Sequence, residues 1–189
     1  YEIVSRDWSS DVCSSDLGPN CAGIIHLSEG KRFGATFLRD LPPGGGIALI
    51  SQSGAIAEEA IAAANRTPLA LSTVVSVGNA TQLGVEDYLE YLGSDPRCTA
   101  VLLYIESLED PDRFRRAARK VAAEKPVVML MGGATRPGAR AASAHTGAIA
   151  NTDQAISAFA AECCVIRVRS LRGLMLAAKG FGFFPQGMG

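Results

Sequence analysis

Three short segments of this chain combine residue types that can do chemistry. The first is Ser51–Ala55, which has the sequence Ser-Gln-Ser-Gly-Ala between an apolar run and an alanine-rich stretch. Small residues at the start of a helix leave backbone N–H groups open to an anion, and the helix dipole favours negative charge there. The same residues could also do no more than cap the helix, so the pattern alone leaves phosphate binding and simple capping open.

His145, one of only two histidines in the chain, marks the second segment. It stands in Ala-Ser-Ala-His-Thr-Gly over 142–147, within a long stretch, 132–150, that is rich in glycine and arginine. Loops of that length are often functional, and an imidazole there can act as a base, a nucleophile or a metal ligand. An exposed loop histidine without a role is the alternative. No second histidine or carboxylate stands at ligand spacing, so we expect no metal site.

Glu106 is the third candidate, because it directly follows the apolar run 100–105. A carboxylate that accepts the N–H of an imidazole fixes its tautomer and leaves the other ring nitrogen free to attack. Without the histidine, an acid solvated at the end of a strand would be the simpler interpretation. The carboxyl ends of parallel strands meet at one edge of a sheet, so we expect all three segments at that edge.

The elements that would position these segments alternate between strand and helix. Apolar and β-branched runs predict strands at 46–51, 71–77, 100–105, 127–131 and 164–168. Alanine-rich or amphipathic stretches predict helices at 55–65, 85–92, 112–123, 152–162 and 171–179. Strands that are apolar on both faces and alternate with helices predict an α/β domain with a doubly wound, parallel, five-stranded sheet. We predict the flavodoxin-like strand order 2-1-3-4-5.

Composition restricts the classes of function. The formal net charge is −1, from 18 basic and 19 acidic residues, which gives no field that would favour nucleic acid or an anionic membrane as a partner. No apolar run approaches the ~18 residues of a membrane span. Five cysteines without a framework spacing indicate reduced thiols and a cytoplasmic protein, and we expect Cys163 and Cys164 on opposite faces of the last strand.

Residues 1–17 match a sequence that is foreign to the protein. Residues 7–17 back-translate to part of a widely used short-read sequencing adapter, and Tyr1–Ile3 fits the upstream part of the same oligonucleotide. The alternative is a flexible Ser/Asp-rich tail that matches by chance. The residues between the two matching stretches leave room for the sample index of the adapter, and agreement on both sides of that gap argues against chance. We therefore expect 1–17 to be a sequencing-adapter artefact rather than native protein, and the native chain to begin upstream of Gly18.

Five motifs in a fixed order resemble the NDP-forming acyl-CoA synthetases, which include the ADP-forming acetate–CoA ligases and, more distantly, the α subunit of succinyl-CoA synthetase. The motifs are Gly18–Cys21, Ser51–Ala55, Val75–Asn79, Glu86–Leu92 and Gly138–Gly147. The resemblance extends from Gly18 to about residue 181. It implies a remnant of a CoA-binding Rossmann domain with a linker at 18–41, a succinyl-CoA-synthetase-like flavodoxin domain at 42–181, and a tail at 182–189.

The same resemblance implies roles for the three segments. His145 corresponds to the phosphorylated histidine and Glu106 to the acid that orients it. The helix N-terminus that holds the phosphohistidine corresponds to Ser51, Gln52, Ser53, Gly54 and Ala55. The last turn of the CoA domain, near the thiol end of the cofactor, corresponds to Gly18, Asn20 and Cys21.

The implied activity is that of a ligase that forms carbon–sulfur bonds. Phosphate attacks an acyl-CoA to give an acyl phosphate and CoA, and His145 takes the phosphoryl group and releases a small carboxylic acid. An ATP-grasp domain or subunit, with Mg²⁺, then passes the group to ADP to make ATP. Because that module and most of the CoA site lie outside the chain, we expect the chain alone to be inactive.

Two points stay open. Residues 79–84, Asn-Ala-Thr-Gln-Leu-Gly, depart from the acidic, lysine-containing run usual in the family, so the acid can be acetate, another short carboxylate or an aryl acid such as a cinnamate. The alternative function is a regulatory module of a bacterial protein lysine acetyltransferase. There the phosphohistidine is typically lost, so His145 favours the ligase. A nucleotide-binding oxidoreductase is excluded, because no G-x-G-x-x-G follows a strand.

Overall fold

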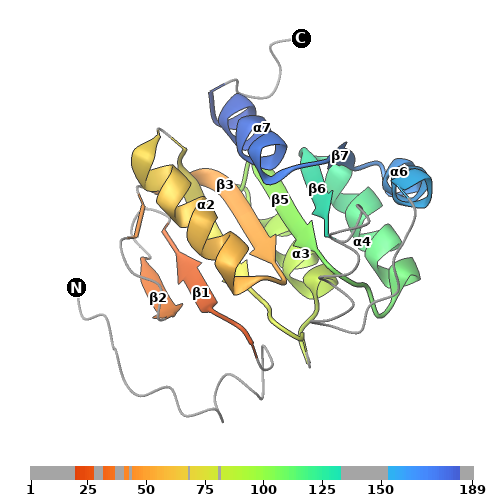
Figure 1. Ribbon diagram of the computed structural model, residues 1–189, viewed down its shortest axis with the longest axis horizontal. Helices are drawn as coiled ribbons and strands as arrows, with labels where there is room; N and C mark the ends of the chain where they lie inside the picture. Colours follow the sequence, from red (N-terminus) through yellow and green to blue (C-terminus); the bar gives the residue numbers. More distant parts are fainter. Residues whose placement is uncertain are drawn as a thin grey trace.

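The computed structural model describes residues 20–27, 32–36, 41–42, 44–67, 69–80, 82–132 and 153–183. Residues 1–17, Gly18 and the segment 133–150 with His145 lie outside these ranges. The described part is an α/β fold in which one mixed sheet has helices on both faces (Figure 1). No helix in it is long and apolar enough to cross a membrane.

Five parallel strands make up most of the sheet. They are β3 (Gly44–Ser51), β4 (Leu71–Ser76), β5 (Ala100–Ile105), β6 (Val127–Met131) and β7 (Ile166–Val168). Their order is β4-β3-β5-β6-β7, and each neighbouring pair is parallel. This is the flavodoxin-like order 2-1-3-4-5 that the sequence predicted, so the carboxyl ends of all five strands lie at one edge.

The five predicted parallel strands are present, but the prediction that they make up the whole sheet was wrong, because two short antiparallel strands extend it. β1 (Gly23–His26) pairs antiparallel with β2 (Phe33–Thr36) and with β4, where Gly23 lies opposite Ser76. The sheet therefore has seven strands and is mixed. Each added strand has only four residues, too few for a hydrophobic period to show in the sequence. Whether 18–41 derives from a CoA-binding domain stays a prediction.

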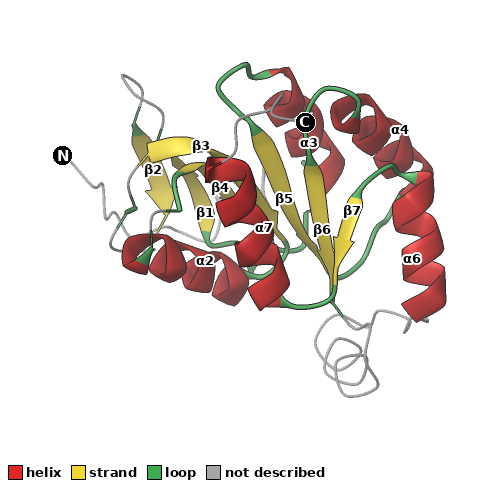
Figure 2. Cartoon of the chain, turned by 90° about the horizontal axis from the view of Figure 1, so that it is seen from above, coloured by secondary structure: helices red, strands yellow, loops and turns green. Residues whose placement is uncertain are grey.

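Five helices in the described residues cover the two faces of the sheet: α2 (Gly54–Arg66), α3 (Val85–Ser94), α4 (Pro111–Ala122), α6 (Asp153–Glu162) and α7 (Leu171–Phe183). α2 and α7 lie on one face, and α3, α4 and α6 lie on the other (Figure 2). Successive strand side chains point to opposite faces, and β5 shows this directly. Leu103 packs into the core beneath α3 and α4, while Leu102 packs into the core beneath α2 and α7.

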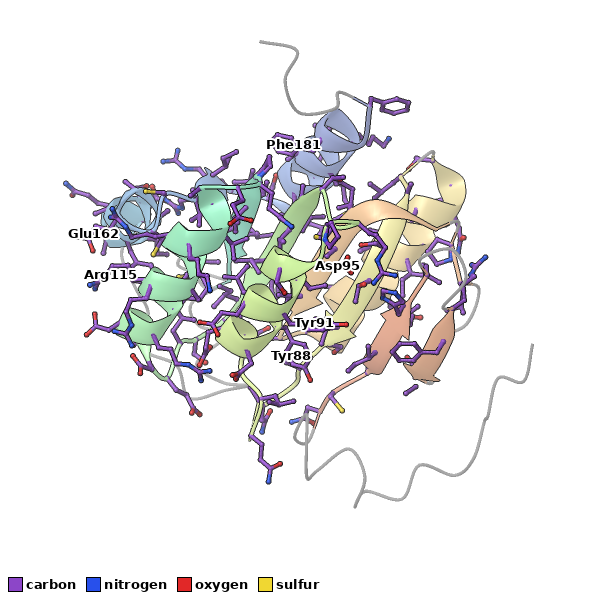
Figure 3. The ribbon with its side chains drawn as sticks, turned by 180° about the vertical axis from the view of Figure 1, so that it is seen from behind. Tyr88, Tyr91, Asp95, Arg115, Glu162 and Phe181 are labelled. Carbon is purple, nitrogen blue, oxygen red and sulfur yellow. The ribbon has the colours of Figure 1, made fainter. Side chains whose placement is uncertain are left out.

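Helix ends follow local sequence signals. Asp110 caps α4 by accepting the N–H of Arg113 at 2.8 Å, Pro111 occupies the first turn, and basic residues occupy the last turn, as the helix dipole favours. On the same face of the sheet, Arg115 of α4 pairs with Glu162 at the end of α6, with 3.5 Å between Nε and Oε2 (Figure 3).

The two adjacent cysteines do not lie in a strand, so that prediction was wrong. Cys163 and Cys164 occupy the turn between α6 and β7. Cys163 is fully buried, whereas Cys164 is exposed and has a φ of 58°. The left-handed turn residue, rather than strand alternation, separates the two thiols. Burial is also the main reason that the pKa of Cys163 is raised to about 11, which keeps this thiol protonated.

Candidate functional site

The carboxyl edge of the parallel strands brings two of the three predicted segments together. Ser51, the last residue of β3, lies opposite Tyr104 of β5. Glu106 directly follows β5, and α2 begins at Gly54 just beyond β3. Because β3 and β5 are neighbours in the sheet, the start of α2 and Glu106 lie at adjacent strand ends, as predicted.

Gln52 joins these two strand ends. Its main-chain N–H donates to the carbonyl of Tyr104 at 3.1 Å. Its side-chain Oε1 accepts the N–H of Glu106 at 2.5 Å and that of Ser107 at 3.0 Å, and its Nε2 donates to the carbonyl of Ser107 at 2.9 Å. The Gln52 amide therefore fixes the main chain of Glu106 relative to the start of α2.

Backbone donors are available at the N-terminus of α2. Ser53 is the N-cap residue, but its side chain makes no capping hydrogen bond. The first bond of the helix runs from the N–H of Ala57 to the carbonyl of Ser53, at 3.1 Å. The N–H groups of Gly54, Ala55 and Ile56 therefore have no partner within the helix. Together with the helix dipole they can hold an anion such as a phosphoryl group.

The five residues predicted to bind phosphate have different places in this turn. The N–H of Ser53 donates to Oγ of Ser51 at 3.1 Å, and Oγ of Ser51 donates to the carbonyl of Ser53 at 2.7 Å. Ser51 is fully buried, and the N–H of Gln52 is already paired with β5. These three residues shape the turn, whereas Gly54 and Ala55 present their N–H groups.

Sequence reasoning missed two residues beside Glu106, namely Tyr104 and Gly132. Tyr104 is partly buried, and burial, the charge of Glu106 and a hydrogen bond to it all raise the pKa of the phenol. A Cβ at Gly132 would lie 2.9 Å from the Tyr104 hydroxyl and 3.5 Å from Cγ of Glu106. The signal was present in the sequence, because a tyrosine two residues before a glutamate shares its face of a strand.

Gly132 also shows where the His145 segment leaves the sheet. Its N–H donates to the carbonyl of Ile105 at 2.7 Å, and it is the last described residue before 133–150. The chain therefore enters the segment that carries His145 immediately beside Glu106. His145 itself lies outside the described residues, so its contact with Glu106 stays a prediction.

Asn20 and Cys21 come to the same edge from β1. Because β1 is antiparallel to β4, its first residue lies beside the last residue of β4. Ala22 donates its N–H to Oγ of Ser76 at 3.0 Å, and Nδ2 of Asn20 donates to Oδ1 of Asn79 at 3.2 Å. A Cβ on Gly54 would touch Ala22 at 3.4 Å. Ala22, which directly follows the predicted CoA residues Asn20 and Cys21, thus adjoins the start of α2, while Gly18 lies outside the described residues.

Metal-binding side chains do not gather in the described ranges, where no three His, Cys, Asp or Glu residues could hold one ion. At the start of α2 the described residues offer backbone N–H donors, with the carboxylate of Glu106 at the adjacent strand end. Such a set can bind and orient a phosphoryl group or an imidazole without a fixed cation.

Comparison with known proteins decides the family. The model of the succinyl-CoA ligase like flavodoxin domain matches residues 44–181, which is most of the chain. The chain belongs to this family. This succinyl-CoA-ligase-like domain is 40% identical over 158 residues to the ADP-forming acetate–CoA ligase I of Archaeoglobus fulgidus, covering 84% of this chain and 23% of that ligase. It is 40% identical over 139 residues to a trans-feruloyl-CoA synthase of an unknown prokaryotic organism, covering 70% of this chain and 19% of that synthase.

A solved structure shows the same architecture. The succinyl-CoA-ligase-like domain superposes with a TM-score of 0.82 and 30% sequence identity on the dinucleotide-forming acetyl-coenzyme A synthetase 1 of Ca. Korarchaeum cryptofilum, a structure in complex with phosphate and ADP. The match covers 92% of this chain and 37% of that one. The chain thus corresponds to one domain of larger multidomain ligases, and the CoA-synthetase family resemblance of its motifs is confirmed.

Proposed function

We propose that this domain transfers a phosphoryl group through a phosphohistidine at His145 in an NDP-forming acyl-CoA ligase. The observation that carries the proposal is the convergence at one sheet edge of three features. These are the N–H groups that begin α2, the acid Glu106, and Gly132, from which the chain enters the His145 segment. The match to ADP-forming ligases supports the same activity.

The proposed reaction has three steps. Phosphate attacks the acyl-CoA thioester, so that a carbon–oxygen bond forms, the carbon–sulfur bond breaks and CoA leaves as the thiol. A neutral ring nitrogen of His145 then attacks the phosphorus, and the bond between phosphorus and the acyl oxygen breaks to release the carboxylate. Finally a terminal oxygen of ADP attacks the phosphohistidine, giving ATP and the free imidazole. The reverse direction activates an acid.

The residues of this chain have separate roles in that scheme. Glu106 accepts one N–H of the imidazole, which fixes its tautomer and leaves the other nitrogen free to attack. The N–H groups of Gly54 and Ala55 stabilise the charge on the phosphoryl oxygens. Asn20 and Cys21 stand where the CoA thiol would approach. An ATP-grasp module, with Mg²⁺, supplies the nucleotide site.

The acid that this ligase uses is proposed only as a class. The two relatives described above are named for acetate and for a feruloyl group, so similar domains serve ligases of very different acids. In this proposal the N–H groups at the start of α2 and the Glu106 carboxylate contact the phosphoryl group and the imidazole rather than the acyl chain. The proposal therefore includes both a short carboxylate and an aryl acid as substrates.

Phosphorylation with labelled ATP and an ATP-grasp module tests the proposal directly. The chain should acquire an acid-labile, base-stable phosphate, as expected for a phosphoramidate. His145→Asn should abolish the label, and Glu106→Gln should slow labelling while the melting temperature stays unchanged. His26→Gln is the matched control, because His26 is the other histidine and is buried in β1, where its Nδ1 lies 2.9 Å from Oγ1 of Thr73. A label that survives His145→Asn overturns the proposal.

A second experiment tests the division of labour between domains. The purified chain should not turn over acetate, ATP and CoA, because the nucleotide module and most of the CoA site are proposed to lie elsewhere. Adding a CoA-binding part and an ATP-grasp part should restore turnover. Turnover by the chain alone would show that the domain assignment is wrong.

A further inference from the structure

Tyr104 and Glu106 are placed so that the phenol can act on the carboxylate. They lie two residues apart at the end of β5, and alternation along a strand puts both side chains on one face of the sheet. Tyr104 packs there against the core beneath α2 and α7. Its neighbours across the strands are Ser51 of β3 and Leu130 of β6. The ring is therefore held against this face of the sheet, and its hydroxyl lies near Gly132 at the end of β6.

Gly132 makes room for that hydroxyl. A Cβ on this residue would approach the phenol oxygen to 2.9 Å, which is closer than side-chain carbons normally come. The position of Gly132 is itself fixed by the hydrogen bond that its N–H donates to the carbonyl of Ile105 at 2.7 Å. The hydroxyl thus lies over the Cα of Gly132 and beside Glu106.

Electrostatics keep the phenol in its donor form. Burial disfavours the phenolate, the negative charge of Glu106 disfavours it further, and so does the hydrogen bond to Glu106. All three raise the pKa of Tyr104, so its hydroxyl stays protonated at neutral pH. A protonated phenol next to a carboxylate donates to it, and hydrogen bonds to charged acceptors are the stronger kind.

We propose that Tyr104 is a positioning residue, whose hydroxyl holds one carboxylate oxygen of Glu106 and so leaves the other directed at the imidazole that the acid orients. The inference rests on the proposed function of Glu106. It completes the support of that residue, because Gln52 fixes the main chain of Glu106 and Tyr104 fixes its side chain. An acid free to rotate would spend less time in the orientation that selects the reactive tautomer.

Single-turnover labelling with labelled ATP and an ATP-grasp module measures this role. Tyr104→Phe keeps the ring in the sheet and removes only the hydroxyl, and it should slow phosphorylation about tenfold, the expected effect of one hydrogen bond to a charged group. The dependence of the labelling rate on ATP concentration should not change, because the proposed nucleotide site lies on the ATP-grasp module. Tyr91→Phe is the matched control, since Tyr91 is 62% exposed on α3 (Figure 3). A Tyr104→Phe rate equal to that of the control overturns the proposal.

Gly132→Ala tests the same contact from the other side. The added methyl should displace the phenol from Glu106, with a rate loss similar to that of Tyr104→Phe. The double variant should be no slower than either single variant, because both remove one interaction. Losses that multiply would show that Gly132 acts independently of Tyr104 and would contradict the proposed contact.

Titration of the phenol separates this inference from the proposed function. Tyr104 can be followed by NMR in the chain alone, with Tyr104→Phe identifying its signal. The pKa of Tyr104 should be above the ordinary tyrosine value in the wild type and should fall in Glu106→Gln. An unchanged pKa would show that the two side chains do not interact and would overturn the inference. If the wild type takes no label but the pKa falls, the proposed function fails while the contact stands.

Discussion

Replacing Gln52 by alanine removes the side chain that links the end of β3 to the end of β5. Three hydrogen bonds disappear, from the N–H groups of Glu106 and Ser107 to Oε1 and from Nε2 to the carbonyl of Ser107. A typical hydrogen bond contributes about 0.5–1.5 kcal/mol to stability. Because Ser107 is exposed, water replaces two of the three, and only the N–H of Glu106 is partly buried. We therefore expect a loss of roughly 1–2 kcal/mol.

That loss corresponds to a fall in melting temperature of about 2–8 °C for a domain of this size. The effect on chemistry should be larger than the effect on stability. The main chain of Glu106 loses its fixed position, and displacing a catalytic group by about 1 Å can cost a hundredfold in rate. Labelling at His145 should therefore slow by about ten- to a hundredfold in Gln52→Ala.

Two further variants sharpen the result. Gln82→Ala is the matched control, because Gln82 is an exposed glutamine in the turn before α3. Gln52→Glu keeps an acceptor for both N–H groups but turns a carboxylate oxygen toward the carbonyl of Ser107. It should retain part of the stability, yet react more slowly than the wild type, because its charge repels the phosphoryl group. Gln52→Ala with the melting temperature and labelling rate of Gln82→Ala would refute the reasoning.

Three further predictions concern the rest of the chain. Deleting residues 1–17 should leave the melting temperature unchanged; a loss of ~2–5 kcal/mol, comparable to truncating a core side chain, would mean that they belong to the fold. Asp110→Ala should cost about 1 kcal/mol in chemical denaturation, because Asp110 caps α4 through the N–H of Arg113, and an unchanged midpoint would contradict that role. Hydrogen bonding from Arg97 lowers the pKa of Asp95, so this carboxylate stabilises the fold above about pH 4 and loses that effect as the pH falls further. The stability difference between wild type and Asp95→Asn should therefore shrink in acid, and a pH-independent difference would count against the ion pair.

The parallel part of the sheet was predictable because its signals are strong and local. β4, β5, β6 and the second part of β3 are buried almost throughout, so the apolar runs stood out, and every connecting helix has an amphipathic or alanine-rich sequence. The order of the strands followed from general rules for α/β sheets rather than from any one residue. The hairpin of β1 and β2 escaped notice because its stability comes from pairing with β4, a contact that a local pattern does not record.

The candidate site was predicted in outline but not in its details. Ser51–Ala55 and Glu106 were identified from residue type and from their place after apolar runs. The bridge from Gln52 and the contact between Tyr104 and Gly132 depend on how neighbouring strands align, which is a property of the tertiary structure. A glycine at the end of a strand gives no sign of the hydroxyl it accommodates. The place of His145 relative to Glu106 stays a prediction.

The topology itself explains why the polar residues gather between β3 and β5. The chain leaving β3 turns into α2 on one face of the sheet, whereas the chain leaving β5 passes to α4 on the other face. Connections that diverge from adjacent strands open a crevice at their carboxyl ends, which is where ligands bind in sheets of this kind. A domain that binds no ligand there would gain stability if apolar side chains filled this crevice. This chain instead uses the Gln52 amide to link the two strand ends, and places beside it the Glu106 carboxylate and the uncapped N–H groups of α2, which an imidazole and a phosphoryl group would satisfy.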